Sequence, residues 1–486
     1  MTKKDIVLRE LYKLIKEIID NKALDTPIAE ETLRAAATEL EKLAIKLIEK
    51  DPEEVFVEII DEYHEAVDAE ALLSPGIATI IQDSKECIYL PVYKGNIGFD
   101  THTHISQDTR FDLASITKLF TVLEALKLNQ DGLFDINQMV DEYEASYFKK
   151  LHVTVADLLR FKYELQTKGR LDEPNITSQQ FFRRLFRPQI GPNTHIYSDI
   201  PFIIAKMLMA NNEMKFFSDY LGELGLLSVG YDTNGTITGG YDHRVADPKA
   251  RLLQDYSITP GHAGLFGTAD DLIKVFDGLN NGFLTQESLD MLLSPGTTER
   301  YAPTYDKEGR QTGQKPIVRG MGVYIEHPDG LRVGEVIPGS SKRAFAITGY
   351  TGGYAGYDLQ NGFASVILAN PISIEATAAK VLVSRVPEGN KTLLDKSGVP
   401  FEEGTTIVSN YVDGKKNITV LSPDGFELEV KRPYTNLMNG VKMAQFYTLL
   451  KLRLTKRVAK ALAKSDLMVD HIDEMYSGGK DFGRGR

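Results

Sequence analysis

The chain has 486 residues, enough for one large domain with additions or for two to three domains, and its 42% hydrophobic and 26% charged residues are an ordinary balance for a globular protein. Its formal net charge of −12 argues against nucleic acid as a partner. The single cysteine, Cys87, excludes an internal disulfide, and its strand-like surroundings predict a small core residue. Charged residues interrupt the first apolar run, and no stretch approaches about 18 apolar residues. We therefore find no signal peptide or membrane span and expect a cytoplasmic protein.

The N-terminal part is predicted to be helical. Apolar residues recur at helical spacing in three stretches, 4–21, 28–50 and 52–72. We therefore assign residues 1–70 to an N-terminal helical segment. A hairpin is predicted to follow, with strands over 77–82 and 87–93 joined by the polar turn Asp83-Ser84-Lys85.

The central part, residues 71–388, is predicted to form one domain. Residues 115–290 are mainly helical in pattern, and Thr268-Ala-Asp-Asp271 has the form of a capping box. Strands are predicted in five later segments, 319–326, 331–337, 343–349, 354–359 and 363–369, before a helix that begins near Ser373. These elements predict an α/β fold of the α+β type, in which an antiparallel sheet flanked by helices lies beside a helical subdomain.

The C-terminal part carries two predicted additions. Residues 389–432 form a linker and a small β addition, with strands over 406–412, 418–421 and 426–430. Residues 433–486 form a basic amphipathic helix and a flexible tail.

The charge of this helix leaves three arrangements open. Residues 431–464 carry nine Lys or Arg and no acid, whereas residues 51–72 carry nine acids and no Lys or Arg. Both helices could pack on the body with their charges in water. The acidic and basic helices could instead pair, within one chain or between two. The 433–464 helix could also make a weak contact with an anionic membrane surface. Self-association and membrane contact are therefore our partner hypotheses for this helix.

Ser115-Ile-Thr-Lys118 is the pattern that most suggests chemistry. A serine hydroxyl needs a base to act as a nucleophile, and a lysine three residues later lies one helical turn away. Ser146 and Ser477 have the same spacing to a lysine, but only Ser115 precedes an apolar helical run that could bury the pair. The alternative is that Ser115 only caps a helix.

Three further segments favour the chemical interpretation: Tyr197-Ser198-Asp199, Pro260–Leu272 and Ile347-Thr348-Gly349. In this order and at these separations, they and the Ser115 motif resemble the serine β-lactamase and penicillin-binding protein superfamily. The resemblance is greatest to its class C-like branch, which includes class C β-lactamases, D-aminopeptidases and family VIII esterases. It implies a β-lactamase/transpeptidase-like fold over residues 71–388.

The resemblance implies that Tyr197 assists proton transfer from Ser115. Where the family has an asparagine, this chain has Asp199, whose negative charge would hold Lys118 protonated and make it a poor base. Tyr197 would then be the main base, with the Lys118 cation stabilising the tyrosinate. Whether Lys118 or Tyr197 is the base stays open, as does a helix-capping role for Asp199.

The third motif departs from the family pattern at its first position. There the family has a cation that attracts a substrate carboxylate, and this chain has Ile347. The resemblance implies that Thr348 and Gly349 line the substrate, and that the backbone N–H of Tyr350 joins that of Ser115 as an oxyanion hole. Ile347 therefore favours esterase or amidase activity over β-lactamase activity.

His262 is an alternative base, although a histidine hydrogen-bonded in a buried turn is the simpler interpretation. The other histidines lack ligand spacing, so we expect no metal site, and we expect no cofactor. We predict a serine hydrolase that acts through an acyl-enzyme on a small-molecule ester, amide or D-amino-acid peptide. The rival hypotheses are a catalytically silent binding or scaffold protein with the same fold, and a cytoplasmic peptidase or carboxypeptidase for muropeptide-like fragments.

Overall fold

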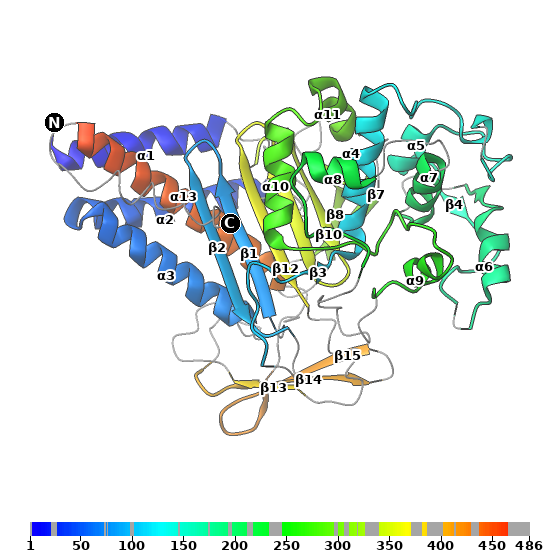
Figure 1. Ribbon diagram of the computed structural model, residues 1–486. Coiled ribbons are helices and arrows are strands. Elements are labelled where there is room, and N and C mark those ends of the chain that lie inside the picture. The colour runs from blue at the N-terminus through cyan, green and yellow to red at the C-terminus, as the bar shows by residue number, and fades with distance from the viewer. Residues whose placement is uncertain are drawn as a thin grey trace.

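The computed structural model shows a six-stranded antiparallel sheet with helices on both of its faces (Figure 1). The strand order is β2-β1-β12-β11-β10-β9. The bounds of these strands are β1 Gly76–Asp83, β2 Ile88–Gly95, β9 Tyr324–Ile325, β10 Ala344–Gly349, β11 Gly353–Asp358 and β12 Phe363–Ala369. The residues that the structure describes are 2–20, 27–71, 74, 76–97, 102–143, 146–173, 175–192, 197–210, 217–232, 245–295, 300–305, 311–317, 319–325, 340–370, 382–385, 402–412, 415–428 and 437–464.

Both faces of this sheet are buried, because its strands are apolar on both sides. In β1, Ala78 and Ile80 belong to one hydrophobic cluster, whereas Ile77 and Ile81 belong to another. Helix α10 (Ala269–Asn280) and the short helix η1 (Ala114–Ile116), which leads into α4 (Thr117–Gln130), cover the first side, which we call the site face. Helices α3 (Pro52–Ala71) and α13 (Leu437–Lys464) cover the second side, the back face.

A helical subdomain lies beside the site face (Figure 1). Its elements are η1 Ala114–Ile116, η2 Val140–Glu142, α5 Val155–Leu159, α6 Ser178–Leu185, α7 Ile200–Ala210, α8 Phe217–Glu223, α9 Pro248–Asp255 and α11 Gln286–Leu293, with the short pairs β3 Phe111–Asp112 with β6 Phe266–Gly267 and β4 Leu165–Gln166 with β5 Gln189–Ile190. The capping box predicted at the start of α10 is confirmed, since Thr268 and Asp271 exchange hydrogen bonds there.

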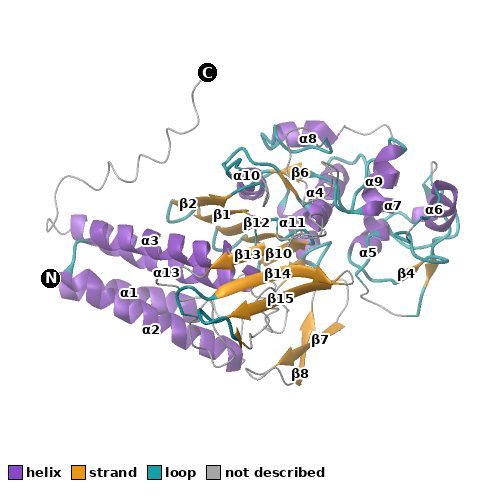
Figure 2. Ribbon diagram, turned by 90° about the horizontal axis from the view of Figure 1, so that it is seen from below, coloured by secondary structure: helices purple, strands orange, loops and turns teal. Residues whose placement is uncertain are grey.

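The back face is covered by segments from both ends of the chain. Helices α1 (Lys3–Asp20) and α2 (Pro27–Glu49) pack with α3 and α13 (Figure 1, Figure 2). The acidic and basic helices pair within the chain, because Lys451 Nζ of α13 lies 2.8 Å from the Glu62 carboxylate of α3. The apolar stripe of α13 is buried at these contacts: Val441, Phe446, Leu449, Leu450, Leu454, Val458 and Leu462. Self-association and membrane contact stay predictions.

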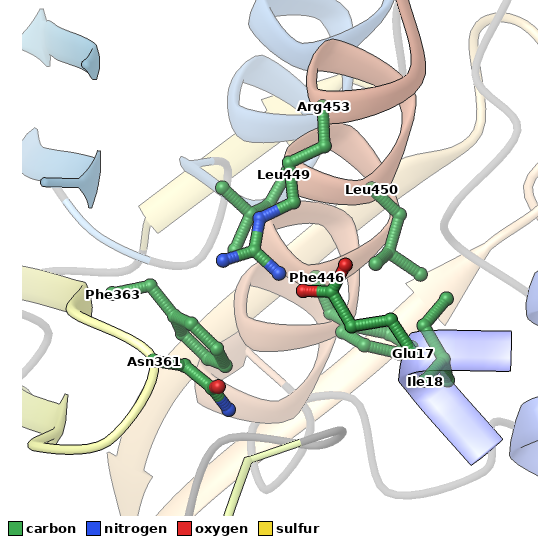
Figure 3. Close-up of a pocket in the computed structure, with 8 residues that line it drawn as sticks. All are labelled: Glu17, Ile18, Asn361, Phe363, Phe446, Leu449, Leu450 and Arg453. Carbon is green, nitrogen blue, oxygen red and sulfur yellow. The ribbon is translucent and has the colours of Figure 1, made fainter. Parts of the chain in front are cut away.

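A small cavity lies where α1 and α13 meet the end of the sheet (Figure 3). Glu17 and Ile18 of α1, Phe363 of β12 and Arg453 of α13 are among the residues that line it. Its volume of about 20 Å³ suits a single water molecule and is too small for a substrate.

The small β addition is a separate four-stranded antiparallel sheet in the order β13-β14-β15-β16. Its strands are β13 Leu382–Arg385, β14 Thr406–Val412, β15 Lys415–Leu421 and β16 Glu427–Leu428. The three strands predicted after residue 401 are therefore present, and β13 joins them from before residue 389.

Some local predictions were wrong. The strand expected over 319–326 is reduced to β9, because Gly322 with φ +70° belongs to a tight turn. The hairpin β7 (Arg300–Tyr305) and β8 (Gln311–Ile317) was not predicted. Cys87 is exposed rather than in the core, because the turn of the first hairpin extends to it.

Two predictions cannot be compared with the structure. The strand expected over 331–337 and the helix expected from Ser373 lie outside the described residues. Within the described residues, no helix combines the length and apolar character that crossing a membrane requires.

Candidate active site

Ser115 lies on the short helix η1 directly before α4, in a turn whose backbone is unusual. Ala114 has φ +45°, a region that residues with a Cβ rarely adopt. Asp112 holds this turn, because its carboxylate accepts hydrogen bonds from the N–H groups of Ala114 (2.8 Å) and Ala246 (2.7 Å). The Ser115 hydroxyl makes no capping bond at the start of η1 or α4, so the capping interpretation of Ser115 is wrong. Backbone strain of this kind is concentrated at functional sites.

The structure brings Ser115, Lys118 and Tyr197 together. Lys118 Nζ lies 3.0 Å from Ser115 Oγ, and Tyr197 Oη lies 2.7 Å from the same oxygen. Lys118 Nζ is also 4.9 Å from the centroid of the Tyr197 ring. Lys118 is completely buried, whereas Tyr197 is 37% exposed, so the cluster is reached from the Tyr197 side.

Lys118 is surrounded by acceptors that favour its charged form. Its Nζ lies 2.8 Å from the Asp199 carboxylate and 3.0 Å from the His262 carbonyl oxygen. Burial disfavours the ammonium, but the charge of Asp199, with a contribution from Tyr197, outweighs burial and raises the pKa of Lys118 above its ordinary value. Lys118 is therefore a cation at neutral pH.

Asp199 serves the charge of the site and not the cap of α7. Burial alone would raise the pKa of this carboxyl, but Lys118, His262 and Lys249 hold it well below its usual range. The hydrogen bond at the start of α7 comes instead from Ser198, whose hydroxyl accepts from the N–H of Ile200 at 3.3 Å. The capping interpretation of Asp199 is therefore wrong.

A second row of charged groups, which the sequence analysis missed, lies behind Asp199. Lys249 Nζ lies 3.3 Å from Asp199 and 3.0 Å from Asp247. Asp247 in turn lies 3.0 Å from His262 Nε2, in a ring that is completely buried. The interpretation of His262 as a hydrogen-bonded histidine in a buried turn is thus confirmed, and its carbonyl oxygen is what contacts Lys118. Neither Lys249 nor Asp247 belongs to a sequence motif that could have revealed it.

Asp199, Asp247 and His262 also offer metal-ligand atoms within 4.8 Å of one another. The ammonium of Lys249 already contacts both carboxylates, so it supplies the positive charge that a metal ion would bring. We therefore assign this cluster to an ion-pair network.

Strand β10 carries the third motif and ends against the turn that holds Ser115. A Cβ on Gly349 would lie 2.8 Å from the carbonyl oxygen of Leu113, so only glycine permits this approach. Thr351, after the strand, donates to the carbonyl oxygen of Asp112 at 2.6 Å. Tyr350 lies between these two contacts with its side chain 72% exposed. The backbone N–H of Tyr350 as an oxyanion donor stays a prediction.

The side chains of Ile347 and Thr348 in the third motif point to opposite faces of the sheet, and their contact with a substrate stays a prediction. Ile347 is buried in the same hydrophobic cluster as Leu113 and Ile116, on the site face. Adjacent strand residues point to opposite faces, so Thr348 is directed to the back face with its pairing partner Tyr354. The site-facing position where the family has a cation is therefore apolar.

Arg319 was also missed, and it is the cation closest to the Tyr197 ring after Lys118 among the described contacts. Its guanidinium carbon lies 5.4 Å from the centroid of that ring. A lone arginine in a turn carries no motif, so no signal in the sequence pointed to it.

Comparison of the chain with models of known protein families identifies its family. A family model described as β-lactamase matches residues 68–371, which is more than half of the chain. The chain therefore belongs to the β-lactamase family of serine hydrolases. No curated protein sequence matches the chain significantly.

Three solved structures that resemble part of this chain are named for different activities. EstCE1, "a hydrolase with promiscuous acyltransferase activity", is 15% identical with TM-score 0.48, over 66% of this chain and 98% of its own. A class C β-lactamase in complex with cefoxitin is 16% identical with TM-score 0.47, over 65% and 94%. The D-amino acid amidase of Ochrobactrum anthropi is 17% identical with TM-score 0.44, over 64% and 91%.

Proposed function

We propose that this protein hydrolyses esters or small amides through an acyl-enzyme formed on Ser115. The observation that carries the proposal is the placement of Tyr197 Oη and Lys118 Nζ at 2.7 and 3.0 Å from Ser115 Oγ. These distances are those of hydrogen bonds through which a hydroxyl can lose its proton. The buried partners and the strained turn are unnecessary for a scaffold, so they favour the enzyme over a silent binding protein.

Tyr197 is the base in this proposal, and Lys118 is its electrostatic partner. The raised pKa of Lys118, caused by Asp199 against the effect of burial, leaves it without a free electron pair at neutral pH. Lys118 Nζ, 4.9 Å from the centroid of the Tyr197 ring and 3.0 Å from Ser115 Oγ, stabilises the negative charge that develops as the proton moves between these two hydroxyl groups.

The proposed reaction has two steps, the acylation of Ser115 and the hydrolysis of the acyl-enzyme. Ser115 Oγ bonds to the substrate carbonyl carbon while its proton passes to Tyr197, and the backbone N–H groups of Ser115 and Tyr350 hold the oxyanion. Tyr197 returns the proton to the leaving alcohol or amine as the bond to that group breaks. A water molecule then attacks the acyl-enzyme and gives one proton to Tyr197. Tyr197 passes this proton to Ser115 Oγ as the bond between Ser115 and the acyl group breaks, which releases the acid and restores both side chains.

Intact-mass spectrometry after treatment with a fluorophosphonate tests the proposal. We expect one adduct on the wild-type protein and none on Ser115→Ala. The matched control is Ser146→Ala, because Ser146 has the same spacing to a lysine but its hydroxyl accepts a hydrogen bond from the backbone N–H of Phe148 at 3.0 Å. This control should keep the adduct. A folded wild-type protein that stays unlabelled, while a control hydrolase is labelled, would support the silent scaffold instead.

A further inference from the structure

Arg319 lies among three aromatic rings at the side of the candidate active site. Its guanidinium carbon is 4.9 Å from the ring centroid of Tyr324, 5.4 Å from that of Tyr197 and 5.5 Å from that of Phe161. Phe161 and Tyr197 stack on each other with centroids 5.4 Å apart. Contacts of a cation with ring faces orient a guanidinium but do not use its N–H donors.

The charge of Arg319 is not neutralised within the described part of the chain. Its one hydrogen bond there is to Tyr324 Oη, at the long distance of 3.5 Å, and it has no carboxylate partner among those residues. Arg343, directly before β10, differs in this respect, because it forms an ion pair with Asp290 at 2.8 Å. Arg319 therefore keeps donors and a positive charge for a group from outside the chain.

The backbone around Arg319 is fixed by both halves of the domain. The N–H of Met321 donates to the Leu292 carbonyl at 3.0 Å, and that of Gly322 donates to the Leu159 carbonyl at 2.9 Å. On the other side, Tyr324 of β9 pairs with Ala346 of β10. Arg319 therefore lies beside β9, the strand that pairs with β10, and β10 carries Ile347.

We propose that Arg319 binds a carboxylate of the substrate and replaces the cation that is missing at Ile347. This inference rests on the proposed function at Ser115 and narrows its substrates to carboxylate-bearing esters or amides. A guanidinium can hold a carboxylate through two parallel N–H bonds. Arg319 lies beside Tyr197, and in the proposed mechanism Tyr197 returns its proton to the leaving group. We therefore place the substrate carboxylate on the leaving group.

A binding experiment on Ser115→Ala tests this without turnover. The probes are 3-acetamidobenzoate and its neutral methyl ester, followed by ligand-observed NMR. We expect the carboxylate to bind about 10-fold or more tightly than the ester, and Arg319→Gln in the Ser115→Ala background to remove the difference. Arg319→Lys should keep part of it, and the control Arg343→Gln all of it. Equal behaviour of the two probes, including no binding of either, overturns the proposal.

Rates of ester hydrolysis distinguish a role of Arg319 in substrate binding from a role in holding Tyr197 in place. Arg319→Gln should lower kcat/KM about 10- to 100-fold more for 3-acetoxybenzoate than for methyl 3-acetoxybenzoate, mainly through KM, because the loss on the methyl ester contains only the contact of Arg319 with the Tyr197 ring. An equal loss on both esters would mean that Arg319 only positions Tyr197. Failure of Ser115 to react with the fluorophosphonate would instead count against the proposed function, and the binding experiment would still decide the role of Arg319.

Discussion

Two buried aspartates show how differently the two faces of the sheet handle charge. On the back face, Asp83 at the end of β1 is completely buried and forms an ion pair with Arg453 of α13. Beside the site face, Asp112 is 3% exposed and its carboxylate accepts only backbone N–H groups among the described residues. Burial therefore raises the pKa of Asp112 to about 6, with the N–H groups of Ala246 and Ala114 opposing it.

The comparison shows that charged side chains have two roles in this molecule. Ion pairs on the back face join segments that are far apart in the chain, such as Arg457 of α13 with Glu17 of α1 at 2.7 Å. The charges around Ser115 instead fix the protonation of Lys118 and the shape of one turn. Changes on the back face should therefore reduce stability, and changes at Lys118 should reduce reactivity.

The largest expected effect is that of Lys118→Met on reactivity. Without the cation, the negative charge that develops at Ser115 Oγ during proton transfer loses its stabilising partner, so the rate of fluorophosphonate labelling should fall by about 10²- to 10⁴-fold. Lys149→Met is the matched control, because Lys149 has the same spacing from Ser146 and donates to the Tyr143 carbonyl at 3.0 Å. If both variants react like the wild type, Lys118 has no part in the chemistry.

Arg453→Leu should affect stability and leave reactivity unchanged. The change leaves the buried carboxylate of Asp83 without its cation, which costs about 3–5 kcal/mol. Denaturant unfolding measures the loss, and fluorophosphonate labelling of the folded variant should keep the wild-type rate. The double variant Arg453→Leu/Asp83→Asn should regain part of the stability. A loss of labelling at full stability would mean that the two faces are coupled.

The smallest expected effect is a pH dependence from Asp112. Because its folded-state pKa of about 6 lies above the ordinary 3.8, the folded protein binds this proton more tightly than the unfolded chain. The contribution of Asp112 is thus fully present below about pH 4 and is lost as the pH rises through about 6. The shift of about two units corresponds to about 3 kcal/mol at most.

The measurement is the free energy of unfolding of the wild type minus that of Asp112→Asn, between pH 4 and 7. This difference should decrease as the pH rises, because only the wild type has the titrating group. A difference that is constant or increases with pH would show that Asp112 ionises in the folded protein as readily as in water.

The sequence by itself determined the family and the order of the main elements. The spacing of Ser115 and Lys118 before an apolar run predicted that the two side chains lie together on one helical turn, because helical periodicity is a local property. Tyr197 was instead assigned to the site through the resemblance of its motif to that of the superfamily. The short apolar runs of β10, β11 and β12 and the capping box at Thr268 were equally local signals.

Only the tertiary structure decided which charges meet. Lys249, Asp247 and Arg319 belong to no motif, and their roles follow from contacts between segments that are distant in the chain. The protonation of Lys118 likewise depends on Asp199, which α7 brings to within 2.8 Å. Electrostatic interactions act through space and depend on burial, so the pattern along the chain cannot specify them.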